Sequence, residues 1–331
     1  MSAQLKRRDF ITLLGGAAVA WPLAASGQQA MPVIGYLGIS SPEPFASRLQ
    51  AFRYGLSETG YVEGRNVTID YRWAENQFDR LGTLAVDLVN HRPSTIVAAG
   101  SIAGALAVKA ATTTIPIVFE TGADPVAAGL VPSLSRPGGN ITGVTSLNVE
   151  VNPKRLELLH ELIPNARVVA LLVNPASASI TRPLLPQMQA AARTPGLELH
   201  ILQASGESEI ESAFARFAQL GAEGLVVGSE PFFNSRNAQL GILALRYGVP
   251  TIFQSREFAD AGGLASYGGN VTESHRLTGH YAGRILKGEK PANLPVQQST
   301  KIELIINLKT AKKFGITVPL PLSGRADELI E

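Results

Sequence analysis

The sequence of 331 residues contains no cysteine. This absence excludes disulfide bonds, thiolate metal sites, thiol nucleophiles and N-terminal lipidation through cysteine. Beyond the N-terminal region, no segment is apolar over the ~20 residues that a membrane-spanning helix needs. With 45% hydrophobic and 17% charged residues, the composition is typical of a globular protein, and the length allows two domains that each bury a core.

Net charge is also missing once the N-terminal region is set aside. The whole chain has a formal charge of +2, and removing residues 1–27 takes away Lys6, Arg7, Arg8 and Asp9, which leaves 26 basic and 26 acidic residues. A balanced chain gives no reason to expect nucleic acid or an anionic membrane surface as a partner.

Residues 1–27 have the pattern of an export signal peptide. A basic start is followed by an apolar stretch at 10–20 and by small residues at the −3 and −1 positions before Gln28, where we expect cleavage. The pair Arg7-Arg8, followed by "DFI", is similar to the twin-arginine motif that the export translocon reads. A Sec signal that happens to hold two arginines is the alternative, and either route predicts a periplasmic protein.

The remaining chain alternates short β-branched runs with longer amphipathic segments. Strands are expected at 32–39, 66–74, 94–100, 115–120, 166–174, 197–204, 223–229, 249–254 and 263–268. Helices are expected at 45–59, 78–91, 102–111, 154–162, 179–193, 208–219, 234–247, 273–287 and 309–314. Alternation of this kind indicates parallel βαβ units with both sheet faces covered. We therefore predict an α/β fold with two Rossmann-like lobes, each containing a parallel sheet.

The Pro, Gly and Asn-rich stretch at 137–153 is the best candidate for the first link between the lobes. We assign residues 31–148 and about 271–293 to lobe 1, residues 149–270 and about 294–320 to lobe 2, and 321–331 to a C-terminal tail. Hinge crossings are then expected near 146–152, 268–271 and 294–300.

Open parallel sheets bind ligands at the carboxyl ends of their strands, so the loops after the strands supply the candidate residues. In lobe 1 these are Ser40, Ser41, Phe45, Ser101, Asp124, Asn140 and Ser146. In lobe 2 they are Asn174, Glu230, Phe232, Gln254 and Tyr267. Most of these residues also have a simpler structural interpretation. Ser40 and Ser41 suit an ordinary turn or a helix cap, and of the adjacent Phe232 and Phe233 we expect one in the core and one exposed.

Two of these loops are the most specific. Gly100-Ser101 opens a helix whose free N–H groups could hold a carboxylate or phosphate. Asp124-Pro125 could be no more than the cap of a short helix. We nevertheless expect Ser101, Thr121 and Asn140 to lie at the same sheet edge, where Asp124 would accept a hydrogen bond from a ligand donor.

Little in the sequence indicates an enzyme. The chain has no G-x-S-x-G nucleophile motif, no dinucleotide fingerprint and no phosphate-binding P-loop. The histidines fall inside expected helices or a strand, and His275 and His280 have the wrong spacing for a zinc pair. Asp124 and Glu230 could in principle form an acid/base pair, but no partner to orient a base is evident. We expect no metal and no cofactor.

Several stretches together resemble one family. They are "MPVIGYLG", "ATTTIPIVFETGADPVAAGLVPSLSRPGGNITGVTS", "KRLELLHELIPNARVVALLVNP" and "SGRADELIE". The chain resembles the ABC-transporter substrate-binding proteins of the tryptophan/tyrosine-transport type over almost its whole length. That resemblance implies the type I periplasmic-binding-protein fold and a monomer that passes a small-molecule solute to an inner-membrane permease with its ATPase.

In that family, helix N-termini bind the carboxylate of an aromatic amino acid and an acid binds its amine. Here "GSIAG" and "SEPFF" depart from the family pattern. The identity of the solute therefore stays open among an aromatic acid, a branched amino acid and another solute. A periplasmic sensor for a membrane receptor is the second hypothesis, and a periplasmic hydrolase is the third.

Overall fold

The structure is a computed structural model that describes residues 31–299 and 301–331. The predicted export signal at 1–27 lies outside the described residues. Residues 32–331 form one compact unit that contains two separate β-sheets. No helix among the described residues is both long and apolar enough to cross a membrane.

In the part of the chain that the structure describes, the first sheet has six strands, and all of its pairings are parallel. The strands are β1 (Val33–Gly38), β2 (Thr68–Trp73), β3 (Thr95–Ala99), β4 (Ile117–Thr121), β5 (Ile141–Thr145) and β11 (Gln297–Gln298). They lie in the order β11-β5-β4-β3-β1-β2. Four of them match predicted strands, whereas β5 lies inside the stretch that was expected to be a link. Its run of β-branched residues, which follows the Gly138-Gly139 turn, explains the strand.

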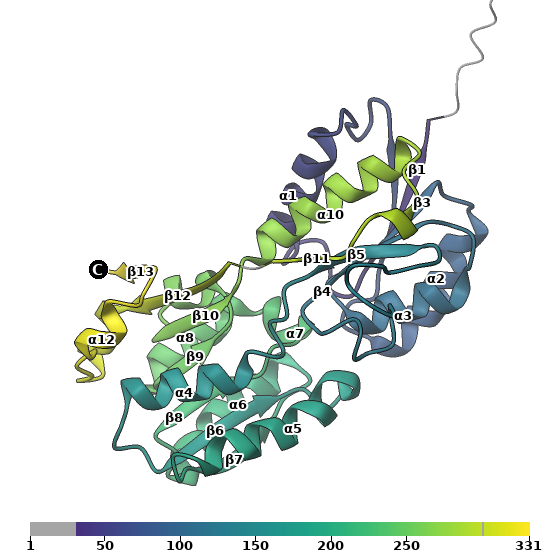
Figure 1. Ribbon diagram of the computed structural model, residues 1–331. Helices are drawn as coiled ribbons and strands as arrows, with labels where there is room; N and C mark the ends of the chain where they lie inside the picture. The colour runs from purple at the N-terminus through teal and green to yellow at the C-terminus, as the bar shows by residue number, and fades with distance from the viewer. Residues whose placement is uncertain (1–30, 300) are drawn as a thin grey trace, which may run out of the picture. The chain divides into compact units, whose positions relative to one another are not determined.

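Helices cover both faces of this sheet, as its apolar strands require. They are α1 (Ala46–Ser57), η1 (Phe78–Arg80), α2 (Leu81–Asn90), α3 (Ile102–Ala111), α10 (Val271–Leu286) and η3 (Pro291–Asn293). One hydrophobic cluster joins α2 and α3 to the sheet, and another joins α1 and α10 to it. Figure 1 shows α1 and α10 side by side although they are far apart in sequence.

The second sheet, counted over the described residues, has seven strands in the order β13-β12-β10-β9-β8-β6-β7. They are β6 (Val168–Val173), β7 (Glu198–Gln203), β8 (Gly224–Val227), β9 (Thr251–Phe253), β10 (Ala265–Gly269), β12 (Ile302–Asn307) and β13 (Glu328–Ile330). Among these described strands, only the β10–β12 pair is antiparallel. The sheet is therefore mostly parallel, and the strands predicted between 166 and 268 are confirmed in type and order.

The helices of the second half are α4 (Asn152–Leu162), α5 (Ala178–Arg193), α6 (Glu207–Phe217), η2 (Ala218–Leu220), α7 (Pro231–Asn234), α8 (Asn237–Tyr247), α9 (Arg256–Asp260), α11 (Leu308–Lys313) and α12 (Leu320–Ser323). Helices α4 and α5 pack on one face of the sheet, and α6, α8 and α9 pack on the other. The short helices α7, α9 and α12 are absent from the prediction because each is five residues or fewer, too short to show a helical period.

The chain passes between the sheets at 146–151 and at Asn270, and again between β11 and β12. Two predicted boundaries are wrong. Residues 294–298 were assigned to lobe 2, but β11 pairs with β5, and Leu294 is buried with the first sheet's core. The predicted tail at 321–331 instead holds α12 and β13, which pairs with β12.

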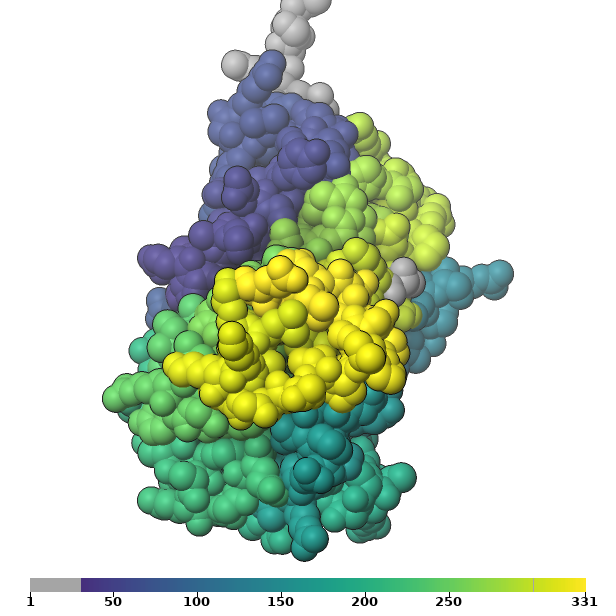
Figure 2. All heavy atoms as spheres, turned by 90° about the vertical axis from the view of Figure 1, so that its left-hand side faces the viewer, coloured from purple at the N-terminus to yellow at the C-terminus, as the bar shows by residue number. Residues whose placement is uncertain are grey.

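The C-terminal residues are gathered at the surface in Figure 2 (yellow). Between α11, α12 and β13 lies a hollow of about 510 Å³ whose lining includes Leu308, Ile316 and Val318. Arg256 forms an ion pair with Glu328 of β13, which ties the end of the chain to α9. This segment is therefore part of the second α/β unit.

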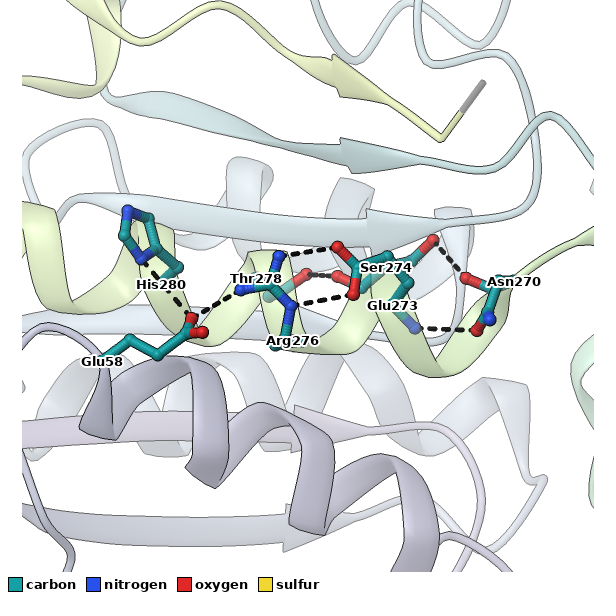
Figure 3. Close-up of polar contacts among 7 residues, drawn as sticks. All are labelled: Glu58, Asn270, Glu273, Ser274, Arg276, Thr278 and His280. Atoms are coloured by element: carbon teal, nitrogen blue, oxygen red, sulfur yellow. Dashed lines mark hydrogen bonds and ion pairs between the residues drawn. The ribbon is translucent and has the colours of Figure 1, made fainter. Parts of the chain in front are cut away.

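Helix α10 approaches α1 closely because glycines stand at the contact. A Cβ atom on Gly279 would lie 2.0 Å from the carbonyl oxygen of Phe52, and one on Gly55 would lie 1.8 Å from the carbonyl oxygen of Arg276. At the rim, Arg276 pairs with Glu58, which directly follows α1, at 2.6 Å and with Glu273 of its own helix at 2.6 Å (Figure 3).

The start of α10 is fixed as well. The side chain of Asn270 caps it by accepting a hydrogen bond from the N–H of Glu273 at 2.9 Å (Figure 3). The helix therefore begins directly after the second crossing, and its first residues have a defined position beside the first sheet.

Candidate functional site

A cavity of about 30 Å³ lies among loops that follow strands of both sheets. Its polar lining consists of Arg48, Ser101, Glu120, Thr121, Ser146, Asn148, Ser229, Glu230, Asn234, Gln254 and His275. Phe45, Ile102, Val149, Ile180, Pro231 and Val271 supply apolar walls. The volume holds about two water molecules, so a solute of amino-acid size requires these walls to separate before it enters.

Five of the twelve candidate residues line this cavity: Phe45, Ser101, Ser146, Glu230 and Gln254. Ser101, Ser146, Glu230 and Gln254 lie one to three residues beyond the end of a parallel strand. The rule that ligands bind at the carboxyl ends of parallel strands is the reason these residues were selected, and it brings them together here.

Ser101 has a different role from the one expected. Its hydroxyl oxygen caps α3 by accepting from the N–H groups of Ala103 at 3.1 Å and Gly104 at 3.4 Å. The expected anion cradle of free helix N–H groups is therefore occupied by protein atoms. Since both bonds use the oxygen as acceptor, the hydroxyl proton of Ser101 is left to donate into the cavity.

Asp124 does not line the cavity. One carboxylate oxygen accepts from the N–H groups of Val126 at 2.8 Å and Ala127 at 3.2 Å, so it caps the turn at 125–129 that follows it. No helix forms there. The simpler interpretation of this acid, a cap, accounts for its geometry.

Replacement of Asp124 with alanine is expected to lower the free energy of unfolding by about 1 kcal/mol, because two turn N–H groups lose their acceptor. Solute affinity should not change. Urea denaturation and a binding titration of the same protein test both statements, and a Kd more than tenfold weaker in a folded Asp124→Ala protein would contradict them.

The other candidates of lobe 1 lie elsewhere. Asn140 precedes β5 and is therefore at the opposite, amino edge of the sheet from Ser101 and Thr121, where its amide donates to the carbonyls of Thr112 and Ile115. The expectation that it shares their edge is wrong. Ser40 is buried outside the cavity lining, and Ser41 lies in the turn before α1 rather than at its cap.

Three candidates of lobe 2 also lie behind the cavity wall. Phe232 and Phe233 are both buried in one core cluster, so the expectation of one exposed ring is wrong. The side chain of Tyr267 packs against the α4 and α5 side of the second sheet. Asn174 reaches the site indirectly, because its amide donates to Glu230 at 3.1 Å.

Three buried ionisable residues of the cavity were missed from the sequence: Arg48, Glu120 and His275. Glu120 is at the end of an otherwise apolar strand, and an acid at that position was a signal that could have found it. Arg48 and His275 lie on amphipathic helices, where the helical period gives no such signal.

Glu120 is the most informative of the three. The residue is 2% exposed, and the N–H of Gly100 donates to Oε2 at 3.0 Å. No described residue donates a hydrogen bond to its Oε1. Burial raises the pKa of Glu120 to about 7, against the opposing effects of Arg48 and the Gly100 hydrogen bond. The cavity therefore holds an acid that is ready to ionise near neutral pH.

His275 stands beside Glu120, with Nε2 at 3.6 Å from Oε2. Its Nδ1 is 2.9 Å from the carbonyl oxygen of Val271, and since a carbonyl only accepts, Nδ1 carries the proton. Burial and the charge of Arg48 lower the pKa of His275 to about 3. The imidazole is therefore neutral and presents Nε2 to the cavity as an acceptor.

Arg48 is the one arginine or lysine in the cavity lining. Its guanidinium lies 5.2 Å from the centre of the Phe45 ring and donates to the carbonyl oxygen of Asn234 at 3.0 Å. Burial lowers its pKa, while Glu257 and Glu120 act in the opposite direction. It thus joins α1 of the first half to α7 of the second.

Glu230 is the second acid of the cavity, and burial raises its pKa to about 7 as well. Both of its oxygens already have protein donors, Oε1 from the N–H of Phe233 at 2.7 Å and Oε2 from Asn174. Of the two acids, Glu120 is therefore the one with an oxygen available to a solute. Among residues 31–299 and 301–331, no cluster of three or more His, Asp or Glu could hold a metal ion.

Comparison with known proteins matches this geometry to one family. The family model described as ABC transporter substrate binding protein matches residues 39–330. A tyrosine-binding protein of Clostridioides difficile is 27% identical over 274 residues, covering 81% of this chain and 76% of that protein.

Two solved structures are similar over 90% of this chain and 99% of their own. One is a conserved domain protein of Vibrio cholerae, with a TM-score of 0.79 and 27% identity. The other is an ABC domain of Streptococcus pneumoniae in complex with L-Trp, with a TM-score of 0.78 and 25% identity. The expected type I periplasmic-binding-protein fold is confirmed, and the matched family is one of binding proteins rather than enzymes.

Proposed function

We propose, from the premise that this chain belongs to the family of ABC transporter substrate-binding proteins, that it is an exported receptor for an aromatic amino acid. After export by the twin-arginine route, the monomer closes its two α/β halves on the solute about the three crossings. It then delivers the solute to an inner-membrane permease driven by an ATPase.

One observation carries this proposal: a buried cavity at the strand ends combines an acceptor side with several donors. Glu120 and His275 supply acceptors, and Gln254 adds a buried Oε1 without a hydrogen-bond partner. Arg48 and Ser101 supply donors. A solute that carries both an amine and a carboxylate matches such a set, because buried polar groups need partners.

The relatives support an aromatic side chain on that solute. One is a tyrosine-binding protein and another holds L-Trp. In this chain Phe45, Val149 and Pro231 line the cavity, and an aromatic ring gains binding energy from contact with such apolar walls.

The test is a thermal-shift panel on the full-length protein, refolded after denaturation to remove co-purified ligand. The panel holds L-tyrosine, L-tryptophan, L-leucine, benzoate, a nucleoside and a sugar. An aromatic amino acid at ~100-fold its Kd should add about 2.7 kcal/mol to stability, which raises the melting temperature measurably. A folded protein that responds only to L-leucine, benzoate, the nucleoside or the sugar, or to nothing in the panel, would refute the proposed solute class.

A further inference from the structure

Arg155 of α4 is a buried arginine behind the cavity wall. Its side chain is completely buried, and no described acid lies within ion-pair distance of it. Burial lowers its pKa to about 9, so the guanidinium remains charged at neutral pH. An ion buried without an acidic partner is costly to keep, and its hydrogen bonds indicate what it does.

Those hydrogen bonds reach three separate parts of the chain. Nε donates to the carbonyl oxygen of Tyr267 at 2.6 Å, on the strand that leads to the second crossing. Nη1 donates to the carbonyl oxygen of Asn148 at 3.0 Å, within the first crossing, and to the hydroxyl oxygen of Ser229 at 2.6 Å. Arg155 therefore connects two crossings to the cavity residues Asn148 and Ser229.

The bonds also determine the direction of two serine hydroxyls. Ser229 accepts from Arg155, and among the described residues its proton has no acceptor. Ser146 accepts from Nδ2 of Asn148 at 3.1 Å, and among the described residues its hydroxyl proton has no acceptor either. Asn148 is itself held by the N–H of Gly269, which donates to Oδ1 at 2.8 Å. Both hydroxyl protons are thus left to donate to a molecule in the cavity.

We propose that Arg155 is a positioning residue that turns the Ser229 and Ser146 hydroxyls into a carboxylate-binding pair. The solute's carboxylate lies at this end of the cavity, and its amine lies at the Glu120 end. The buried positive charge of Arg155 stabilises the carboxylate without touching it. This inference rests on the proposed function and adds which end of the solute each wall binds.

The experiment compares two probes that differ in the carboxylate alone, L-tyrosine and tyramine, by calorimetric titration of the full-length protein. Wild type should bind L-tyrosine at least ~100-fold more tightly than tyramine. Ser229→Ala should lose ~10-fold or more of its affinity for L-tyrosine, the value of one hydrogen bond to a charged group, and little for tyramine. Arg155→Met should lose more of the preference for L-tyrosine over tyramine than Ser229→Ala does. Arg155→Lys should recover part of that preference.

Arg182→Met, an exposed arginine on neighbouring α5, is the control and should keep both affinities. Equal losses for L-tyrosine and tyramine would show a merely structural role and overturn the inference. If Arg155→Met fails to fold, Ser229→Ala decides alone. A wild type that binds both probes equally refutes the carboxylate site but leaves the receptor function standing, whereas one that binds neither probe, and no L-tryptophan, refutes both.

Discussion

Replacement of Glu120 with glutamine is expected to weaken the binding of L-tyrosine or L-tryptophan by ~100-fold at pH 8. The change keeps the shape of the side chain but removes the buried negative charge that we assign to the solute's amine. Loss of one partner from a buried charge pair costs about 3 kcal/mol, which corresponds to that factor. Calorimetric titration at pH 8 measures the change in Kd.

The same variant should be more stable than wild type at high pH. The pKa of Glu120 is raised to about 7 in the folded protein, so the folded state binds the proton more tightly than the unfolded state. The contribution of Glu120 to wild-type stability should therefore fall as pH rises from about 4.5 to 7, by an amount on the order of 3 kcal/mol. Urea denaturation of both proteins at pH 5 and pH 8 should show that the stability gain of Glu120→Gln is much larger at pH 8 than at pH 5.

The neighbours of Glu120 keep their charge over this range. The pKa of Glu230, the second acid of the cavity, is also raised to about 7, so the comparison with Glu120→Gln isolates the part of the pH dependence that belongs to Glu120. His275 has a pKa lowered to about 3 by burial and stays neutral, and burial raises the pKa of Tyr36 well above its usual value. Arg48 stays cationic. Solute affinity in wild type should consequently fall as the pH drops below 7. The control is Glu211→Gln, on the exposed face of α6, which should behave as wild type. A pH-independent affinity would argue against the assignment.

Replacement of Gly279 with alanine is expected to destabilise the protein by about 3 kcal/mol. The added Cβ would lie 2.0 Å from the carbonyl oxygen of Phe52 and 2.8 Å from the backbone nitrogen of Leu56. These are backbone atoms, so the two helices must move apart rather than a side chain rotate. The midpoint of urea denaturation measures the loss.

Gly82→Ala in α2 is the matched control. A Cβ atom at Gly82 meets nothing within 4 Å, and alanine is favoured over glycine in helices by up to about 1 kcal/mol, so stability should stay the same or rise. Because α10 carries His275, Gly279→Ala should also weaken solute binding in the fraction that folds. A Gly279→Ala protein as stable as wild type would contradict the close packing of α1 and α10.

More of the fold than of the site could be predicted from the sequence. The period of buried residues predicts long elements well, and α3 at 102–111 matches its prediction at both ends. Pairing between distant segments leaves no local pattern, which is why β11 was assigned to the wrong sheet.

The same distinction applies to the residues of the site: loop position could be predicted from the sequence, and packing between elements could not. Loop position selected Ser101, Ser146, Glu230 and Gln254, because the edge of a parallel sheet is a property of chain direction. It also selected Asp124, whose carboxylate accepts a hydrogen bond from the backbone N–H of Val126 instead of facing the cavity. Whether a side chain faces a cavity depends on packing across elements, as it does for Arg48, and that is not encoded in local sequence.

The return of the chain to its first sheet has a consequence during synthesis. The Glu58–Arg276 contact joins residues 218 positions apart, so the glycine face of α1 has no partner until α10 has left the ribosome. At ~5–20 residues per second, that interval is roughly 10–40 s. Throughout it the nascent first half lacks its edge strand β11 and one covering helix, and it exposes apolar surface that a holding chaperone could bind. Neither half is complete until most of the chain has been made.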